Sequence, residues 1–269
     1  MKIGVFDSGF GGIDILKHIV NVLPEYDYVY LGDNARNPYG TKSQDVLEQY
    51  AREATDFLFS KNCQLIIFAC NTASTQALRS IQQTHIPKQH PGKNALGMII
   101  PAAEAAVKTG TGIGVIATES SVSSGAFEKE IVKLNPDAQV YSQACPLLVK
   151  LVETGEQDQE IINKVLDRYL QPLVDKKIDT LVLGCTHYGL LEEQIQNTLE
   201  RLGSSAVIVH EGRVVAQKFK TYLSQHPEYQ LKLSKGGTQI FYASDKTDTF
   251  KKLGSQYFGS EIDIHKAEL

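Results

Sequence analysis

Two apolar runs, at residues 65–69 and 181–184, each end at a cysteine, and they constrain the fold more than any other feature of the chain. Apolar runs of this length with polar residues at their ends are typical of strands buried on both faces of a parallel sheet. Such sheets bind their ligands at the carboxyl ends of the strands, where Cys70 and Cys185 are expected. Polar residues follow both cysteines directly: Asn71, Thr72, Thr186 and His187. A matching strand end in each half of the chain therefore predicts one site with two thiols.

Strand-like and helix-like segments alternate along the chain. The expected strands are short apolar runs, and the expected helices have apolar residues at helical spacing. We expect strands at 2–6, 28–31, 65–70, 112–117, 140–145, 180–184, 206–209 and 239–243. We expect helices at 11–22, 43–61, 75–82, 124–134, 160–176, 190–202, 214–223 and 246–253. This alternation predicts an α/β fold with parallel sheets and right-handed crossovers.

The two halves of the chain follow the same plan. Ile3-Gly4-Val5-Phe6 corresponds to Ile113-Gly114-Val115-Ile116, and the two cysteine strands correspond as well. The fold class that follows is two similar three-layer α/β domains with mainly parallel sheets and an active site in the cleft between them. Prolines and glycines predict a linker at 85–97. The expected domains are 1–97 together with 207–269, which returns to the first domain, and 98–206.

Composition excludes several classes of protein. The net charge of −4 gives no reason to expect nucleic acid or an anionic membrane as a partner. No segment has the apolar length of a membrane span or of a signal peptide. The four cysteines lack the paired spacing of a zinc ribbon and the density of a secreted disulfide scaffold. We therefore expect reduced thiols and a cytoplasmic location.

A free cysteine in a protein core is usually inert, and we expect this of Cys63 and Cys145. Cys70 and Cys185 differ, because each is expected between a buried strand and a helix N-terminus. Unpaired backbone N–H groups at such a position lower the pKa of a thiol from about 8.5. The pattern therefore predicts reactive thiols at these two positions.

The sequence gives little support for a cofactor or a metal. The Asp7–Gly12 segment between a strand and a helix lacks the third glycine of a dinucleotide fingerprint and the lysine of a P-loop. We expect a turn whose backbone N–H groups hold an anion, with Asp7 and Ser8 facing the crevice. Cys185 and His187, two residues apart, are a poor zinc pair. No lysine occupies a convincing Schiff-base position, so pyridoxal phosphate is not indicated.

Other polar residues are expected at the same edge. His187 is placed to exchange a proton with Cys185, and Asp7 with Cys70. Asp33 follows the second expected strand, and Glu153 is either a supporting acid or a solvated helix end. The neutral residues expected to bind a ligand's carboxylates are Ser8, Asn71, Thr72, Thr118 and Thr186.

Two thiols on opposing faces are suited to proton transfer. Inverting a carbon stereocentre requires removal of a proton from one face and delivery of another to the opposite face. A thiolate and a thiol supply both, and the carbanion between them needs a desolvated, preorganised site. Two alternatives stay open: a hydrolase or transferase, which needs only one nucleophilic cysteine, and a non-catalytic amino-acid-binding module.

Four ordered motifs resemble the glutamate racemase family. They are Asp7-Ser8-Gly9-Phe10-Gly11-Gly12, residues 32–43 from Gly32-Asp33-Asn34 to Thr41-Lys42-Ser43, Ala69-Cys70-Asn71-Thr72-Ala73-Ser74 and Leu183-Gly184-Cys185-Thr186-His187-Tyr188. The resemblance implies interconversion of L- and D-glutamate without a cofactor or metal, and supply of D-glutamate for bacterial peptidoglycan.

The resemblance also implies roles for individual residues. Cys70 and Cys185 would be the two acid/bases, with Asp7, His187, Asp33 and Glu153 as supporting catalytic groups. The substrate-binding residues would be Asp7, Ser8, Pro38, Tyr39, Gly40, Asn71, Thr72, Thr118, Thr186 and His187. Glutamate would be the small-molecule partner, and either a monomer or a homodimer is compatible with the sequence.

Three segments depart from the family pattern. Gly189 stands where a proline is usual, Val209-His210-Glu211-Gly212 replaces a segment that commonly ends in Asp-Ser-Gly, and Thr118-Glu119 replaces Thr-Pro. Within the same superfamily, a racemase of aspartate or another acidic amino acid is the nearest alternative. Those relatives typically carry glutamate after the second Cys-Thr, where this chain has His187.

Overall fold

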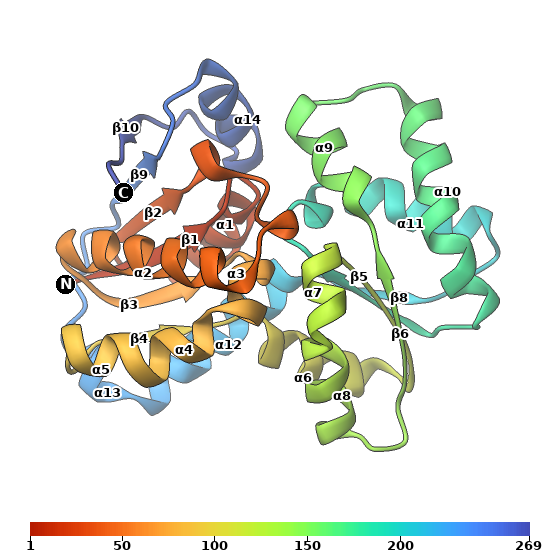
Figure 1. Ribbon diagram of the computed structural model, residues 1–269, viewed down its shortest axis with the longest axis horizontal. Helices are drawn as coiled ribbons and strands as arrows, with labels where there is room; N and C mark the ends of the chain where they lie inside the picture. Colours follow the sequence, from red (N-terminus) through yellow and green to blue (C-terminus); the bar gives the residue numbers. More distant parts are fainter.

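The computed structural model describes residues 1–269, and its ribbon forms two α/β halves side by side (Figure 1). The strands are β1 (Lys2–Asp7), β2 (Tyr28–Gly32), β3 (Cys63–Phe68), β4 (Asn94–Leu96), β5 (Gly112–Ala117), β6 (Gln139–Ala144), β7 (Thr180–Gly184), β8 (Val207–Val209), β9 (Gln239–Ala243) and β10 (Ile264–Lys266). No helix has both the length and the apolar character needed to cross a membrane.

Helices connect these strands. They are α1 (Gly12–Val22), α2 (Gln44–Ser60), α3 (Asn71–Gln76), α4 (Leu78–Ser80), α5 (Ile86–Gln89), α6 (Ile99–Thr109), α7 (Glu119–Ser124), α8 (Ala126–Leu134), α9 (Pro146–Thr154), α10 (Gln159–Asp175), α11 (Glu192–Arg201), α12 (Glu211–Gln225), α13 (Pro227–Gln230) and α14 (Asp248–Phe258). Shorter helical turns are η1 (Asn34–Arg36), η2 (Tyr39–Thr41), η3 (Ile81–His85) and η4 (Tyr188–Leu191).

The two sheets have an order of four strands in common. The first is β10-β9-β2-β1-β3-β4 and the second is β6-β5-β7-β8, and every pairing is parallel. Within the first sheet, β2-β1-β3-β4 repeats the order of the second, so β1 corresponds to β5 and the cysteine strands β3 and β7 correspond. The predicted fold class of two similar parallel α/β halves is confirmed, and β9 and β10 extend only the first sheet.

The predicted linker at 85–97 is wrong. This segment contains the end of η3, the helix α5 and the edge strand β4, which pairs with β3. Pro87 lies in the first turn of α5, where a missing N–H costs little, so its presence does not break the helix.

The chain after residue 206 also differs from the expectation. β8 pairs with β7 in the second sheet, whereas the boundary predicted at 206/207 assigns it to the first domain. α12 then packs against both α1 and α6 and so connects the two halves (Figure 1). The elements that the sequence patterns did not predict include β4, α6, α9 and β10.

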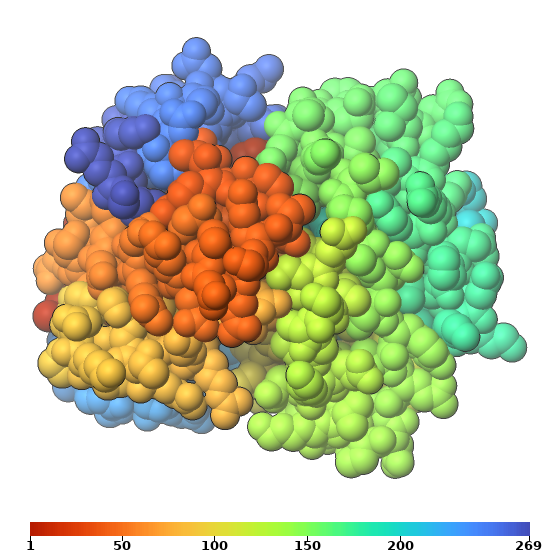
Figure 2. Space-filling view, viewed as in Figure 1, coloured from red at the N-terminus to blue at the C-terminus, as the bar shows by residue number.

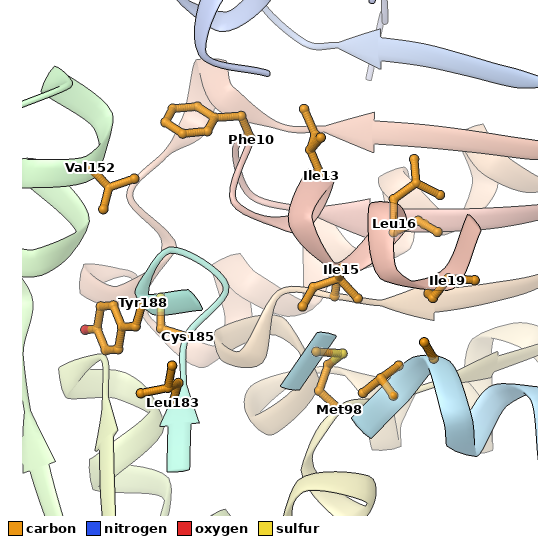
Figure 3. Close-up of a cluster of buried hydrophobic side chains, with 14 of the residues drawn as sticks. Phe10, Ile13, Ile15, Leu16, Ile19, Met98, Val152, Leu183, Cys185 and Tyr188 are labelled. Carbon is orange, nitrogen blue, oxygen red and sulfur yellow. The ribbon is translucent and has the colours of Figure 1, made fainter. Parts of the chain in front are cut away.

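The largest hydrophobic cluster extends across both halves. Figure 3 shows Phe10 and Ile13 of the first half in one close-up with Val152, Leu183 and Tyr188 of the second. Apolar side chains shared in this way favour one relative placement of the two sheets, because separating them would expose apolar surface to water. The carboxyl ends of the two cysteine strands are thereby held at one place.

We expect Leu181→Ala to destabilise the protein by about 2–5 kcal/mol, because Leu181 is fully buried in the strand that leads to Cys185. Urea unfolding measures the change. The same substitution at Leu231, which is 85% exposed, is the matched control and should alter stability by no more than about 0.5 kcal/mol. Equal losses in the two variants would contradict this description of the core.

Candidate active site

Four strand ends position the polar residues predicted for the site. In the first sheet, β1 ends at Asp7. Its neighbour β3 ends at Phe68, two residues before Cys70. In the second sheet, β7 ends directly before Cys185, next to β5, which Thr118 follows. Parallel neighbours end at the same edge of a sheet, so each half contributes one cysteine and its neighbours to a common edge.

Cys70 lies in a water-excluded position at the start of α3. The backbone N–H of Ala73 donates to its Sγ at 3.5 Å, and its thiol donates to the Ser8 hydroxyl at 3.5 Å. Burial raises the pKa of Cys70 to about 12, and the negative charge of Asp7 also raises it, whereas the hydrogen bonds to Ser8 and Ala73 lower it. The predicted lowering of this pKa is therefore wrong, because loss of solvation outweighs the helix N-terminus.

Cys185 belongs to a chain of hydrogen-bonding groups. Its Sγ is 3.8 Å from Nδ1 of His187, whose Nε2 is 3.1 Å from Oε1 of Glu153 on α9. Burial alone would lower the pKa of His187, but its hydrogen bonds to Cys185 and Glu153 raise that pKa well above the ordinary value. This arrangement favours a positively charged His187 beside the sulfur. Glu153 is half-buried and contacts the site, so it is not merely a solvated helix end.

Asp7 is fully buried and connects the two halves. Its Oδ2 accepts the Gly9 N–H at 3.0 Å, and its Oδ1 accepts the hydroxyl of Thr186 at 3.2 Å. Burial raises the pKa of Asp7, against the opposing effects of His187 and of these hydrogen bonds. The backbone N–H groups of the Asp7–Gly12 turn were expected to bind a ligand anion. In the structure, the Gly9 N–H instead donates to the carboxylate of Asp7.

Further hydrogen bonds between the halves enclose the same place. The hydroxyls of Thr72 and Thr118 are 2.9 Å apart, and Asn37 donates to Glu153. Gly40 of η2 lies against Thr118, since a Cβ at Gly40 would be 3.1 Å from the Thr118 Cβ. Figure 2 shows this contact from outside, where the orange segment that contains η2 lies against the yellow-green segment that contains α7.

Asp33 lies beside the site within a separate hydrogen-bonded group. Its Oδ2 accepts Nε of Arg36 at 2.6 Å and the hydroxyl of Tyr39. Asp33 and Tyr39 are buried, while Pro38 between them in the loop is exposed. The structure therefore brings Asp7, Ser8 and the residues around the two cysteines together, and it places Asp33 and Tyr39 in the adjoining wall.

Sequence reasoning missed three residues that contact the site. Phe10 packs edge-on against the ring of His187, Asn37 donates to Glu153, and the buried Glu211 accepts the Asn71 amide at 2.6 Å. Phe10 and Asn37 lie within two of the family motifs, and Glu211 lies in a segment that departs from the family pattern. Only the fold could show their partners, because the contact between residues 71 and 211 joins distant parts of the chain.

The cysteines are close enough to influence one another. The charge of Cys185 contributes to the raised pKa of Cys70, and only 5% of Cys70 and 7% of Cys185 are exposed. Each sulfur also has its own partners, Ser8 and Asp7 for Cys70, and His187 for Cys185. The arrangement can therefore accept a proton at one sulfur and donate one from the other, with water excluded.

We expect Glu211→Gln to remove a pH-dependent loss of stability. Burial raises the pKa of Glu211 from 4.5 to about 8. The folded protein therefore retains a proton that the unfolded chain releases, so stability falls as pH rises from about 4.5 through about 8. Glutamine has nearly the size of glutamate but cannot ionise. The stability of the Glu211→Gln variant relative to the parent should therefore increase as the pH rises across this interval.

Urea unfolding of parent and variant at about pH 5 and about pH 9 measures this difference. The exposed Glu228→Gln is the matched control and should show no such trend. A constant difference between Glu211→Gln and the parent would show that Glu211 does not ionise with the raised pKa.

Comparisons with known proteins agree with this geometry. The family model described as Asp/Glu/Hydantoin racemase matches residues 3–212. The glutamate racemase of Geobacter metallireducens is 38% identical over 271 residues, which cover 99% of this chain and 96% of that protein.

Solved structures are similar over the whole chain. A glutamate racemase from Francisella tularensis in complex with D-glutamate has a TM-score of 0.88 and 32% identity, covering 99% of this chain and 97% of that one. A glutamate racemase isoform from Bacillus anthracis has a TM-score of 0.89 and 31% identity, covering 100% and 97%. The chain therefore belongs to the Asp/Glu/Hydantoin racemase family and, within it, to the glutamate racemases.

Proposed function

We propose that this protein interconverts L- and D-glutamate by a two-base mechanism in which Cys70 and Cys185 exchange protons with opposite faces of the α-carbon. One observation carries the proposal: two buried thiols lie at equivalent strand ends of two similar halves, and each has its own polar partners. A nucleophilic hydrolase or transferase would need only one of these thiols. The D-glutamate bound by the Francisella relative supports the choice of substrate.

The two sulfurs start from different states. Cys70, with a pKa of about 12, is a thiol at neutral pH and is placed to donate a proton. For proton abstraction at the other face, Cys185 acts as a thiolate beside a positively charged His187, with Glu153 as the second partner of the imidazole. Each turnover exchanges the protonation states of the two sulfurs, so the form left by one direction is the form that begins the reverse direction.

The remaining residues have supporting roles in this proposal. The α-carbanion is stabilised by hydrogen-bond donors that are fixed in a dry site, and not by a cofactor. Ser8, Asn71, Thr72, Thr118 and Thr186 supply neutral hydroxyl and amide groups for the two carboxylates, as the family resemblance implies. Tyr39, with Asp33 behind it, forms part of the wall.

The hydrogen bonds between the halves must loosen for glutamate to enter. These bonds join Thr72, two residues after Cys70, to Thr118, and Asn37 to Glu153, whose other partner is His187. Opening and closing of the two halves would admit the substrate and then exclude water during proton transfer. The mechanism needs both thiols reduced, which favours the cytoplasm as its location, and its product would supply peptidoglycan synthesis.

Replacing either cysteine with alanine should lower kcat/KM for racemisation by about 10²–10⁴-fold, because each removes one acid/base. L- and D-glutamate have equal free energies, so each variant must lose the same factor in both directions. Circular dichroism of the reaction mixture, started from each enantiomer, measures the rates. Cys63→Ala is the matched control, since Cys63 is buried in the strand leading to Cys70 and has no role in the mechanism. A variant of Cys70 or Cys185 that racemises at the parental rate would refute the two-base proposal.

A further inference from the structure

Two of the departures from the family pattern meet at one place behind the active site. His210 lies directly before α12, and it approaches Asp14 and His18, which are one turn apart on α1. We call Asp14, His18 and His210 the Asp14 cluster. Gly189, the other departure, borders it: a Cβ there would be 2.7 Å from Nε2 of His210. The mechanism proposed above uses none of these residues.

The spacing within the Asp14 cluster suits a metal ion. Nε2 of His18 is 3.7 Å from Oδ1 of Asp14, and Nε2 of His210 is 3.4 Å from Oδ2 of Asp14. One ligand atom from each residue lies within 4.8 Å of the others. Ligands at about 2.1 Å from a tetrahedral zinc ion are about 3.4 Å apart, which is close to these separations.

A second group of one aspartate and two histidines differs from the Asp14 cluster in its hydrogen bonds. In the cluster of Asp56, His85 and His90, both imidazoles are hydrogen-bonded to one carboxylate oxygen, at 2.7 and 2.6 Å. Asp56 is exposed, so water also solvates this group. The imidazole nitrogens and the carboxylate oxygen of this group are already hydrogen-bonded to one another, so no space is left for an ion between them.

Asp14 and His210 of the Asp14 cluster are buried and only partly hydrogen-bonded. His210 is 4% exposed, and its Nδ1 has no hydrogen-bond partner. Oδ2 of Asp14, the oxygen directed toward His210, is also buried without a partner. Because native structures pair nearly all buried polar atoms, the unpaired Oδ2 of Asp14, 3.4 Å from Nε2 of His210, indicates a missing ligand.

Two glycines leave room for this ligand. A Cβ at Gly189 would also be 3.2 Å from Oδ2 of Asp14, and a Cβ at Gly212 would be 2.5 Å from Cδ2 of His18. Any other residue at either position would press on the Asp14 cluster. The half-buried His18 gives the cluster a route to solvent.

The ligand types and nearby charges limit the choice of ion. Two imidazoles and one carboxylate favour zinc over magnesium or calcium, which prefer oxygen ligands. The guanidinium of Arg213, next to the cluster, is paired with Glu192 at 2.9 Å, so its charge is largely compensated.

We propose that Asp14, His18 and His210 bind one zinc ion, with water as the fourth ligand. The ion would join α1 to the start of α12, and it would lie against Gly189 of η4, four residues after Cys185. It is a structural link between the halves and takes no part in proton transfer.

Isothermal titration of the reduced protein with Zn²⁺ alone tests this site, with Co²⁺ as a spectroscopic probe. We expect one equivalent to bind, and we expect Co²⁺ to give the visible bands of tetrahedral nitrogen and oxygen ligation. Binding at Cys70 or Cys185 would instead add thiolate charge-transfer bands in the near ultraviolet, and such a spectrum as the only response would overturn the proposal.

Variants assign the binding to the cluster. His18→Gln, on a half-exposed helix face, and His210→Gln should each weaken Zn²⁺ binding by about tenfold or more, because each removes a ligand. His90→Gln, in the Asp56 cluster, is the matched control and should bind Zn²⁺ like the parent. If the parent binds no Zn²⁺, or if His18→Gln binds it as tightly as the parent, the site does not exist.

Discussion

The site depends on one buried carboxylate, that of Asp7. It accepts hydrogen bonds from Gly9 in its own loop and from Thr186 in the opposite half, so a single side chain joins the strand ends β1 and β7. Its negative charge also reaches Cys70 and helps keep that sulfur protonated. A buried charge is stable only where it is paired and hydrogen-bonded, and His187 supplies the opposite charge. Asp7 therefore contributes to the position of the loop, to the contact between the halves and to the raised pKa of Cys70.

A racemase acts on two mirror-image substrates, yet the two cysteines proposed as its bases have different surroundings. Cys70 has a hydroxyl and a carboxylate nearby, whereas Cys185 has an imidazole connected to Glu153. The two halves share one order of four strands, since β2-β1-β3-β4 corresponds to β6-β5-β7-β8. The asymmetry lies in the side chains. Because the two enantiomers have equal free energies, the overall free-energy barrier must be the same in both directions, but the surroundings of the two sulfurs need not be the same. Similar halves place the two sulfurs, and different neighbours surround each of them.

The sequence predicted those features that depend on short stretches of chain. The strand ends at Cys70 and Cys185 were predictable because apolar runs followed by polar residues are a local pattern. The raised pKa of Cys70 was not, because it depends on burial by residues distant in sequence. Pro87 misled the assignment of 85–97, since proline is compatible both with a linker and with a first helical turn. The sequence drew attention to Glu211 only as a departure from the family pattern, because its partner Asn71 is brought to it only by the fold.

The central claim is that one sulfur removes the α-proton and the other delivers a different one. The most direct test is racemisation of L-glutamate in deuterated water, analysed by NMR early in the reaction. The D-glutamate formed should carry deuterium at the α-carbon, while the remaining L-glutamate retains its proton, because the delivering sulfur has exchanged with solvent. D-glutamate that retains the original proton, or L-glutamate that gains deuterium as fast as product forms, would contradict the two-base account.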